Sequence, residues 1–176
     1  MRFWHIFLSF VGKSDFFETF YDIMEKTLVI LKPCAVQRVL IGAIINRFEQ
    51  KGLILCGMKM TWLSEEIVEE HYEHLKEKPF FPSVKNSMLA CPVIITCWKG
   101  VDAVKVVRDL SGSTNGRNAL PGTIRGDYSM SVQENIVHAS DSPQTAAVEL
   151  KRFFKEEELY DYDSALISNL YVNDEI

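Results

Sequence analysis

The feature that most restricts the fold of this chain is the alternation of short apolar segments with amphipathic ones. Residues 27–31 form a continuous apolar run after Thr27 that stops at Pro33, which predicts a buried strand. Apolar residues recur at helical spacing from Ile41 to Phe48, and Gly52 is placed to end that helix. The first two elements predicted in this way are therefore a strand and a helix that can pack back onto it.

The same alternation continues to the end of the chain. Residues 53–62 indicate a strand whose one face carries Ile54, Cys56, Met58, Met60 and Trp62. Next come a helix from Ser64, a segment of helical character over 81–90, a strand over 92–98, a helix over 102–111, a strand over 135–138 and a helix from Ser142. This order predicts a four-stranded sheet covered by helices, for which a split βαβ arrangement is the leading candidate.

Composition limits the class of protein. A chain of 176 residues, 47% of them hydrophobic, can bury one good core and is short for two domains. The net charge of −5 argues against a general binder of nucleic-acid backbones. Lys32, Arg108 and Arg125 can still converge in one cleft, where they would attract small anions.

The cysteines and the apolar runs also exclude some classes. No CxxC pair is present, so free and mostly buried thiols are expected at Cys34, Cys56, Cys91 and Cys97. Such thiols suit a reducing compartment. No apolar run in the sequence reaches the length of a membrane-spanning helix.

The segment around His138 carries the clearest chemical signal. His138 ends a predicted strand and is followed by Ser142, a good N-cap, and Pro143, which suits a first helical turn. We expect Ala147, Leu150 and Phe154 to form the buried stripe of this helix and Glu149 to lie on another face. A histidine whose ring a carboxylate can orient is a candidate nucleophile for an anionic electrophile. The alternative is a strand-end histidine that only satisfies a hydrogen bond.

Six segments, in this order and at this spacing, resemble the motifs of nucleoside diphosphate kinases. They are residues 27–33 (TLVILKP), 44–52 (IINRFEQKG), 71–72 (HY), 79–81 (PFF), 121–127 (PGTIRGD) and 135–141 (NIVHASD). The resemblance runs from about Met24 to about Tyr171. It implies an α+β fold with a ferredoxin-like, four-stranded antiparallel sheet covered by helices. It also implies transfer of the γ-phosphate of a nucleoside triphosphate to a nucleoside diphosphate by a ping-pong route.

The resemblance further implies a role for each matched residue. His138 would carry the phosphate, Glu149 and Ser140 would orient and support it, and Tyr72 would hydrogen-bond the transferring group. The other predicted site residues bind the nucleotide: the phosphates by Arg108, Thr114 and Arg125, the sugar by Lys32 and Asn135, and the base by Phe80 and Val132. Lys32 is also counted with the catalytic group.

The partners follow from the same resemblance. ATP and other nucleoside tri- and diphosphates are the expected ligands, and Mg²⁺ is expected to ride on their phosphates rather than in a metal site of the protein. Neither a nucleic-acid partner nor a membrane span is expected. The family forms tetramers or hexamers, so a homo-oligomer in the cytoplasm is expected.

The chain divides at the point where the resemblance begins. Residues 24–176 form the expected kinase-like domain, and Met24 stands where family members usually begin. Residues 1–23 match neither a typical signal peptide nor a transit peptide. They remain an extension, a targeting segment that would lead to an organelle, or the product of an upstream start.

Several alternatives stay open for individual residues. Arg108 can be a cation at a helix C-terminus, Arg125 can pair with Asp127, and Phe80 can be core packing beside Phe81. The predicted helix also places His71 and His74 three residues apart, where they could share a metal if a third ligand existed. For the whole protein, the alternatives are a regulatory protein that has lost catalysis and a nucleic-acid-binding module.

Five positions depart from the family pattern. Cys34 and Asn118 stand where the family commonly has an acidic residue, and Glu134 stands where it usually has a basic one. Gly116 replaces a common proline, and Ala139 replaces a glycine. None of them removes a proposed reacting group. They bear on affinity, loop order and subunit packing.

Overall fold

The computed structural model describes residues 23–162, 164 and 167–172. Its sheet has the strand order β2-β3-β1-β4. The central strands are β1 (Glu25–Leu31) and β3 (Val93–Gly100), and the edges are β2 (Ile54–Thr61) and β4 (Val137–Ala139). Every neighbouring pair is antiparallel. The predicted α+β fold with a ferredoxin-like sheet is therefore confirmed.

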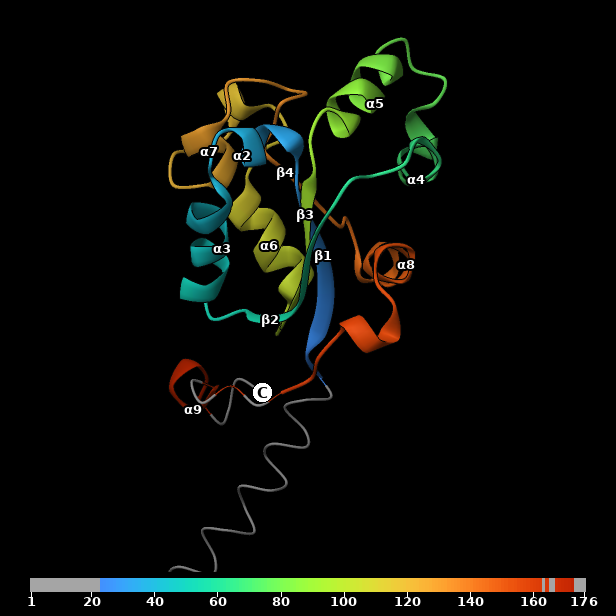
Figure 1. Ribbon diagram of the computed structural model, residues 1–176. Helices are drawn as coiled ribbons and strands as arrows, with labels where there is room; N and C mark the ends of the chain where they lie inside the picture. Colours follow the sequence, from blue (N-terminus) through green and yellow to red (C-terminus); the bar gives the residue numbers. More distant parts are fainter. Residues whose placement is uncertain (1–22, 163, 165–166, 173–176) are drawn as a thin grey trace, which may run out of the picture.

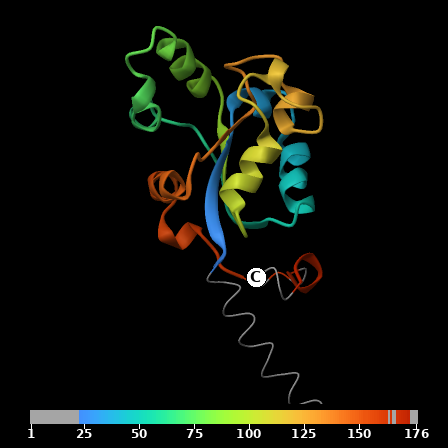
Figure 2. The ribbon, with the colours of Figure 1, turned by 180° about the vertical axis from the view of Figure 1, so that it is seen from behind.

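Helices cover both faces of the sheet. They are α2 (Pro33–Gln37), α3 (Ile41–Gln50), α4 (Glu65–His71), α5 (Phe81–Leu89), α6 (Ala103–Ser111), α7 (Ile124–Tyr128), α8 (Pro143–Phe153) and α9 (Ile167–Leu170), with 3₁₀ turns η1 (Glu73–Leu75), η2 (Gly116–Asn118) and η3 (Glu156–Glu158). Figures 1 and 2 show α2, α3, α6 and α7 on one side of the strands and α4, α5 and α8 on the other. Within the described residues, no helix is long and apolar enough to cross a membrane.

The second half of strand β1, residues 28–31, is apolar because it is covered on both sides. Successive side chains of a strand point to opposite faces. Leu28 and Ile30 belong to the core beneath α4, α5 and α8, whereas Val29 and Leu31 belong to the core beneath α3, α6 and α7. All four are 0% exposed. Because β1 packs against helices on both of its faces, it holds the two helical layers in a defined position relative to each other.

Strand β2 differs from the predicted pattern. Ile54 and Cys56 are buried as expected, but Met58 and Met60 are 54% and 58% exposed, and Trp62 lies beyond the strand at 62%. The register with β3 shifts between Leu55 and Gly57. A bulge inserts one unpaired residue and so reverses the alternation of faces. The prediction that all five side chains share a face is therefore wrong.

Helix α8 begins as predicted but buries a different stripe. Ser142 caps it by accepting a hydrogen bond from the Thr145 amide. Ala147 is exposed, and Glu149 is buried at 5% exposure together with Leu150, so the predicted placement of Ala147 and Glu149 is wrong. An alanine gains little by burial, and a carboxylate can be buried where donors meet it. The donors that meet Glu149 belong to the site described below.

The first prediction concerns the segment before β1. Residues 1–22 lie outside the described residues, and β1 begins at Glu25. A chain that starts at Met24 keeps every described strand and helix, so we expect it to fold and to retain nucleotide exchange. Circular dichroism and an exchange assay on the shortened and full chains measure this. A folded but inactive short chain would show that the segment contributes to the site or to an assembly that the site requires.

Candidate active site

The predicted site residues come together around one cleft with a volume of about 1100 Å³. All of them except Ser140 line this cleft: Lys32, Tyr72, Phe80, Arg108, Thr114, Arg125, Val132, Asn135, His138 and Glu149. Ser140 is 0% exposed and lies beneath it. Its lining residues come from the residue after β1, from β4 and from α4, α5, α6, α7 and α8, so chain segments far apart in the sequence supply its walls.

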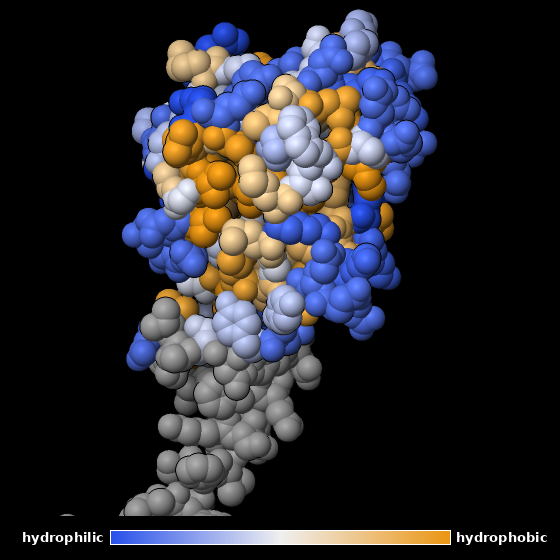
Figure 3. All heavy atoms as spheres, viewed as in Figure 1, coloured by the Kyte–Doolittle hydropathy of each residue, from blue (hydrophilic) through white to orange (hydrophobic). Residues whose placement is uncertain are grey.

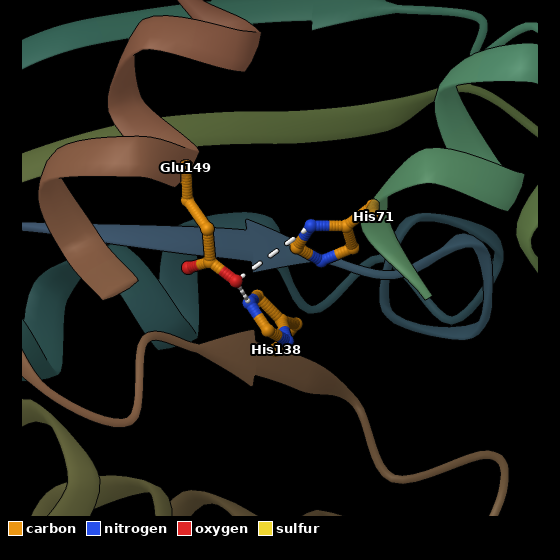
Figure 4. Close-up of side chains that lie close together, drawn as sticks. All are labelled: His71, His138 and Glu149. Atoms are coloured by element: carbon orange, nitrogen blue, oxygen red, sulfur yellow. Dashed lines mark hydrogen bonds and ion pairs between the residues drawn. The ribbon is translucent and has the colours of Figure 1, made fainter. Parts of the chain in front are cut away.

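His138 lies at the middle of β4, opposite Ile30 of β1. Its Nε2 is 2.9 Å from Oε1 of Glu149. The other carboxylate oxygen, Oε2, accepts a 2.6 Å hydrogen bond from the Ser140 hydroxyl. Figure 4 shows the carboxylate of Glu149 directed at the His138 ring. This bond engages Nε2 and leaves Nδ1 as the ring nitrogen available to a ligand in the cleft.

Glu149 is ionised despite its burial. Burial alone would raise the pKa of this carboxyl, but the hydrogen bonds and charge of His138, together with the Ser140 hydroxyl, outweigh it and lower the pKa. A carboxylate so placed accepts a hydrogen bond from Nε2–H of His138 and fixes that tautomer. The arrangement therefore leaves Nδ1 of His138 with a free lone pair that faces the cleft.

Tyr72 and His71 form the wall beside His138. Burial raises the pKa of Tyr72, and the nearby charge of Glu149 adds to the shift, so its phenol stays a neutral donor. The ring of His71 lies 4.4 Å from the ring of His138, centroid to centroid, and its Nδ1 lies 3.6 Å from Oε1 of Glu149. His71, His138 and Glu149 are grouped closely enough to ligate a metal, whereas His74 is exposed and does not belong to that group.

Sequence reasoning missed the place of His71 in the site. The residue was considered only as a metal ligand paired with His74. Its position next to Tyr72 was a usable signal, but α4 ends at His71 and the chain then turns into η1, so helical spacing misplaces the side chain. Only the packing of α4 against β4 and α8 brings His71 to Glu149.

Three cations converge on the other end of the cleft. Burial, reinforced by the charge of Arg125, lowers the pKa of Lys32 to about 8. Burial and the charge of Arg108 lower the pKa of Arg125 to about 10. Arg108 is half exposed and forms an ion pair with Asp141. Mutual repulsion of this kind is relieved by an anion, so this end of the cleft suits phosphate groups.

Arg125 also has a backbone role that was not predicted. Its Nε and Nη2 donate to the carbonyls of Asn135 (3.0 Å) and Val137 (2.7 Å), on either side of Ile136. Ile136 has a φ of 72°, a conformation that is strained for a β-branched residue. Asp127 pairs with Arg47 instead, so the alternative that Arg125 pairs with Asp127 is wrong.

The outer part of the cleft presents two apolar side chains. Phe80 and Val132 are each 51% exposed, whereas Phe81 is buried. The alternative that Phe80 is core packing is therefore wrong. Asn135 is buried below them, where its amide nitrogen donates to the Val132 carbonyl at 2.7 Å. Its amide oxygen has no partner among the described residues, which leaves an acceptor for a hydroxyl donor.

Two of the departures from the family pattern contact each other. Burial raises the pKa of the Cys34 thiol, and the carboxylate of Glu134 adds to this shift. Glu134 also accepts a 2.6 Å hydrogen bond from Ser87 of α5. Gly116, the third departure, is packed so closely that a Cβ there would lie 2.3 Å from the Ser129 carbonyl oxygen. Of these contacts, the one between Glu134 and Ser87 reaches the cleft, because Ser87 is one of its lining residues.

A histidine held by a buried carboxylate, beside a cluster of cations, defines a protein whose cleft suits an anionic small molecule. Comparison with known proteins gives this class a family. The family model for nucleoside diphosphate kinase matches residues 25–159. A nucleoside diphosphate kinase of Parabacteroides distasonis is 70% identical over 152 residues, which cover 86% of this chain and 99% of that protein. One of Pyrococcus abyssi is 49% identical and covers 80% of this chain and 91% of its own length.

Solved structures agree. A halophilic nucleoside diphosphate kinase from Halobacterium salinarum, solved in complex with CDP, has a TM-score of 0.82 at 39% identity and covers 84% of this chain and 99% of that chain. A nucleoside diphosphate kinase family protein from Babesia bovis has a TM-score of 0.80, also at 39% identity, and covers 84% of this chain and 99% of its own. The chain belongs to the nucleoside diphosphate kinase family. It is an enzyme of the phosphotransferase class, and the regulatory alternative without catalysis is set aside.

The second prediction follows from the pKa of Lys32. Below about 8 the ammonium is charged and attracts nucleotide phosphates, and above it the free protein loses this charge. A bound anion raises that pKa, so binding at higher pH must take up a proton. The KM for a nucleoside diphosphate should rise about tenfold between pH 7 and 9. A Lys32→Gln variant should show a higher KM without this rise. A flat profile for the unmodified protein would contradict the assignment.

Proposed function

We propose that this enzyme transfers phosphate by a ping-pong route in which Nδ1 of His138 carries the phosphoryl group. The observation that supports this most is the bond between Nε2 of His138 and Glu149, which leaves Nδ1 free at the cleft. Imidazole is largely neutral at physiological pH and is therefore a competent nucleophile. Covalent transfer also divides one exchange between two nucleotides into two half-reactions that use the same site.

Each half-reaction balances on the same atoms. The Nδ1 lone pair attacks the γ-phosphorus of a nucleoside triphosphate, the bond from that phosphorus to the β,γ-bridging oxygen breaks, and a nucleoside diphosphate leaves. The proton on Nε2 stays between His138 and Glu149, whose negative charge stabilises the cation that forms on the ring. A β-phosphate oxygen of the second diphosphate then attacks phosphorus, the N–P bond breaks, and neutral His138 is restored.

The cations of the cleft bind the phosphates. Arg108 and Arg125 bind the phosphates along one side, and Lys32 adds positive charge there while it donates to a sugar hydroxyl. The neutral phenol of Tyr72 can donate to the transferring group. Mg²⁺ enters as part of the substrate, bound to its phosphates. The lining residues agree with a metal ion that arrives on the nucleotide. Lys32, Arg108 and Arg125 repel a free metal ion, and the carboxylate of Asp141 at that end of the cleft already pairs with Arg108.

The remaining residues hold the nucleoside. The unpaired amide oxygen of Asn135 can accept from a sugar hydroxyl, and Thr114 lies at the phosphate end of the cleft. Phe80 and Val132 can stack on the base from opposite sides. A stacking surface carries no donor–acceptor code, since every base has a π-face. We therefore propose that ATP and other nucleoside tri- and diphosphates all serve as substrates.

The third prediction tests the nucleophile. His138→Ala should bind nucleotide but lose exchange by many decades, because a missing nucleophile leaves only positioning effects. Incubation with a γ-labelled triphosphate should label the unmodified protein with a phosphate that is stable to base and labile to acid. Exchange by the alanine variant at the rate of the unmodified protein would overturn the assignment.

The labelled protein also reports on base selectivity. Chasing it with ADP, GDP, CDP and UDP should remove the label in every case, with kcat/KM values that differ by less than about 10⁴, the discrimination that buried polar readout provides. Glu77→Gln is the control, since Glu77 is exposed and is not among the described residues that line the cleft. It should label as the unmodified protein does.

We also propose that the enzyme works as a homo-oligomer that uses the β2 edge of the sheet. Figure 3 shows apolar side chains gathered on the face where β2 lies. Met58, Met60 and Trp62 are more than half exposed there.

The start of β2 is already covered, because the Tyr160 amide donates to the Cys56 carbonyl and the Tyr162 hydroxyl donates to the Leu55 carbonyl. The exposed apolar remainder of an edge strand invites pairing with another chain. A second copy of this chain, as a tetramer or hexamer, is the proposed cover.

The fourth prediction follows from that edge. Met60→Lys places a charge in the middle of the proposed interface, so it should reduce the mass of the assembly measured by sedimentation velocity while leaving the circular dichroism spectrum unchanged. Glu77→Gln changes the net charge by the same amount at an exposed position away from β2 and should leave the mass unchanged. An unmodified chain that sediments as a monomer would contradict the proposal.

A further inference from the structure

We infer that Glu134 is a positioning residue for the base of the nucleotide, because it holds α5 against the loop that precedes β4. This inference rests on the proposed function, in which the base lies between Phe80 of α5 and Val132 of the loop. Glu134 is not among the described residues that line the cleft, so it acts on the nucleotide through its neighbours. It takes no part in the bond changes at His138.

The two side chains that flank the proposed base site have little packing of their own. Phe80 is the N-cap residue of α5, and Val132 lies in the loop before β4. Each is 51% exposed, although both line the cleft. An exposed side chain is placed chiefly by its backbone, so the separation between Phe80 and Val132 depends on how α5 is held against the loop.

Two hydrogen bonds join α5 to this loop. The Ser87 hydroxyl donates to Oε1 of Glu134 at 2.6 Å, and Nε2 of Gln133 donates to the Ser83 carbonyl at 3.0 Å. A hydrogen bond to a carboxylate is stronger than one between neutral groups. Ser83 and Ser87 follow Phe80 by three and seven residues, a spacing that places all three on one face of a helix. Both bonds therefore act on the face of α5 that carries Phe80.

The backbone of Glu134 is fixed on the loop side. The Ser131 hydroxyl oxygen accepts from the amides of Gln133 and Glu134, both at 3.1 Å. The hydroxyl of Ser129, which is 4% exposed, donates to the Glu134 carbonyl at 3.0 Å. The carboxylate thus reaches Ser87 from a backbone that is held on both sides of its peptide units. Support of this kind lets a side chain define the position of its partner.

The link to α5 depends on the residue type that this chain has at position 134. The family usually has a basic residue there, and the cationic groups of lysine and arginine offer no acceptor to a serine hydroxyl. Burial, with a further contribution from a hydrogen bond to Glu134, raises the pKa of Cys34, so this thiol of α2 stays a neutral donor. One carboxylate therefore connects α5 and α2 to the loop.

A charge effect on Lys32 is the competing explanation for Glu134. Burial and the charge of Arg125 lower the pKa of Lys32 to about 8, and the charge of Glu134 makes a small contribution that opposes this shift. Such an effect requires the negative charge, whereas a positioning role requires only an acceptor for the Ser87 hydroxyl. Glutamine separates the two explanations, because its amide oxygen accepts a hydrogen bond but carries no charge.

The test compares acceptors with and without a base, at a saturating triphosphate donor. Glu134→Ala should raise the KM for ADP about tenfold and change kcat less than about twofold, because part of the stacking contribution is lost in ground state and transition state alike. The KM for ribose 5-diphosphate, which has no base, should not change. A general loss of structure would affect both acceptors, so this difference reports on the base site.

Three further variants locate the effect. Ser87→Ala should raise the KM for ADP as Glu134→Ala does, and the double variant should show no further increase, because both substitutions remove the same bond. Glu134→Gln should keep the KM of the unmodified protein. Asn86→Ala is the control on the same helix, since Asn86 is exposed and is not among the described residues that line the cleft. It should match the unmodified protein.

The outcomes separate this inference from the proposed function. An unchanged KM for ADP in Glu134→Ala, or an equal increase for ribose 5-diphosphate, would overturn the positioning role alone. The same holds if Glu134→Gln raises the KM as alanine does, which would identify a charge effect. Labelling of His138 by a γ-labelled triphosphate does not depend on Glu134. An unmodified protein that exchanges phosphate without this label would therefore overturn the proposed function, whatever the variants show.

Discussion

A carboxylate buried against a β-sheet must be surrounded by donors, and the structure around Glu149 is arranged to meet that requirement. His138 and Ser140 donate to it from the edge strand β4 and the residue that follows this strand. The cap at Ser142 starts α8 at the register that turns Glu149 inward. Desolvation of a charge is costly, so each of these positions is constrained by the others. The ring of His138 is therefore held in place by residues of the protein core.

Most of the fold could be predicted from the sequence because its signals are local. The run of residues 27–31, the helical spacing from Ile41 to Phe48 and the caps at Ser64 and Ser142 each specify one element, and the structure has these elements within a few residues of the expected positions. The order of the elements then leaves few ways to form one sheet. Short helices such as α2 and α7 were missed because four or five residues carry too little periodicity.

The errors arose where long-range packing overrides a local pattern. At Cys56 a bulge reverses the alternation of β2, and no local residue type announces it. On α8, hydrophobicity favoured Ala147 for the core over Glu149, because a sequence does not show which donors will face a carboxylate. The site residues were predicted through the family motifs, whereas His71 needed the packing of α4 against β4. The sequence shows which residue types are available, but it does not show which of them lie close together in the folded chain.

The strained backbone at Ile136 has a consequence for how the site responds to substitution. Arg125 donates to the carbonyls on both sides of Ile136 and, through Nη1, to Gly112 at 2.6 Å. The guanidinium of Arg125 thus stabilises the turn that leads into β4 by hydrogen bonds, and it also contributes positive charge to the cleft. Kinetic loss in any Arg125 variant will therefore combine a relaxed turn with a missing cation. A measurement of ligand affinity alone does not separate these two effects. In a background that already lacks the backbone strain, such as Ile136→Gly, the further loss of affinity in an Arg125 variant reports the contribution of the charge.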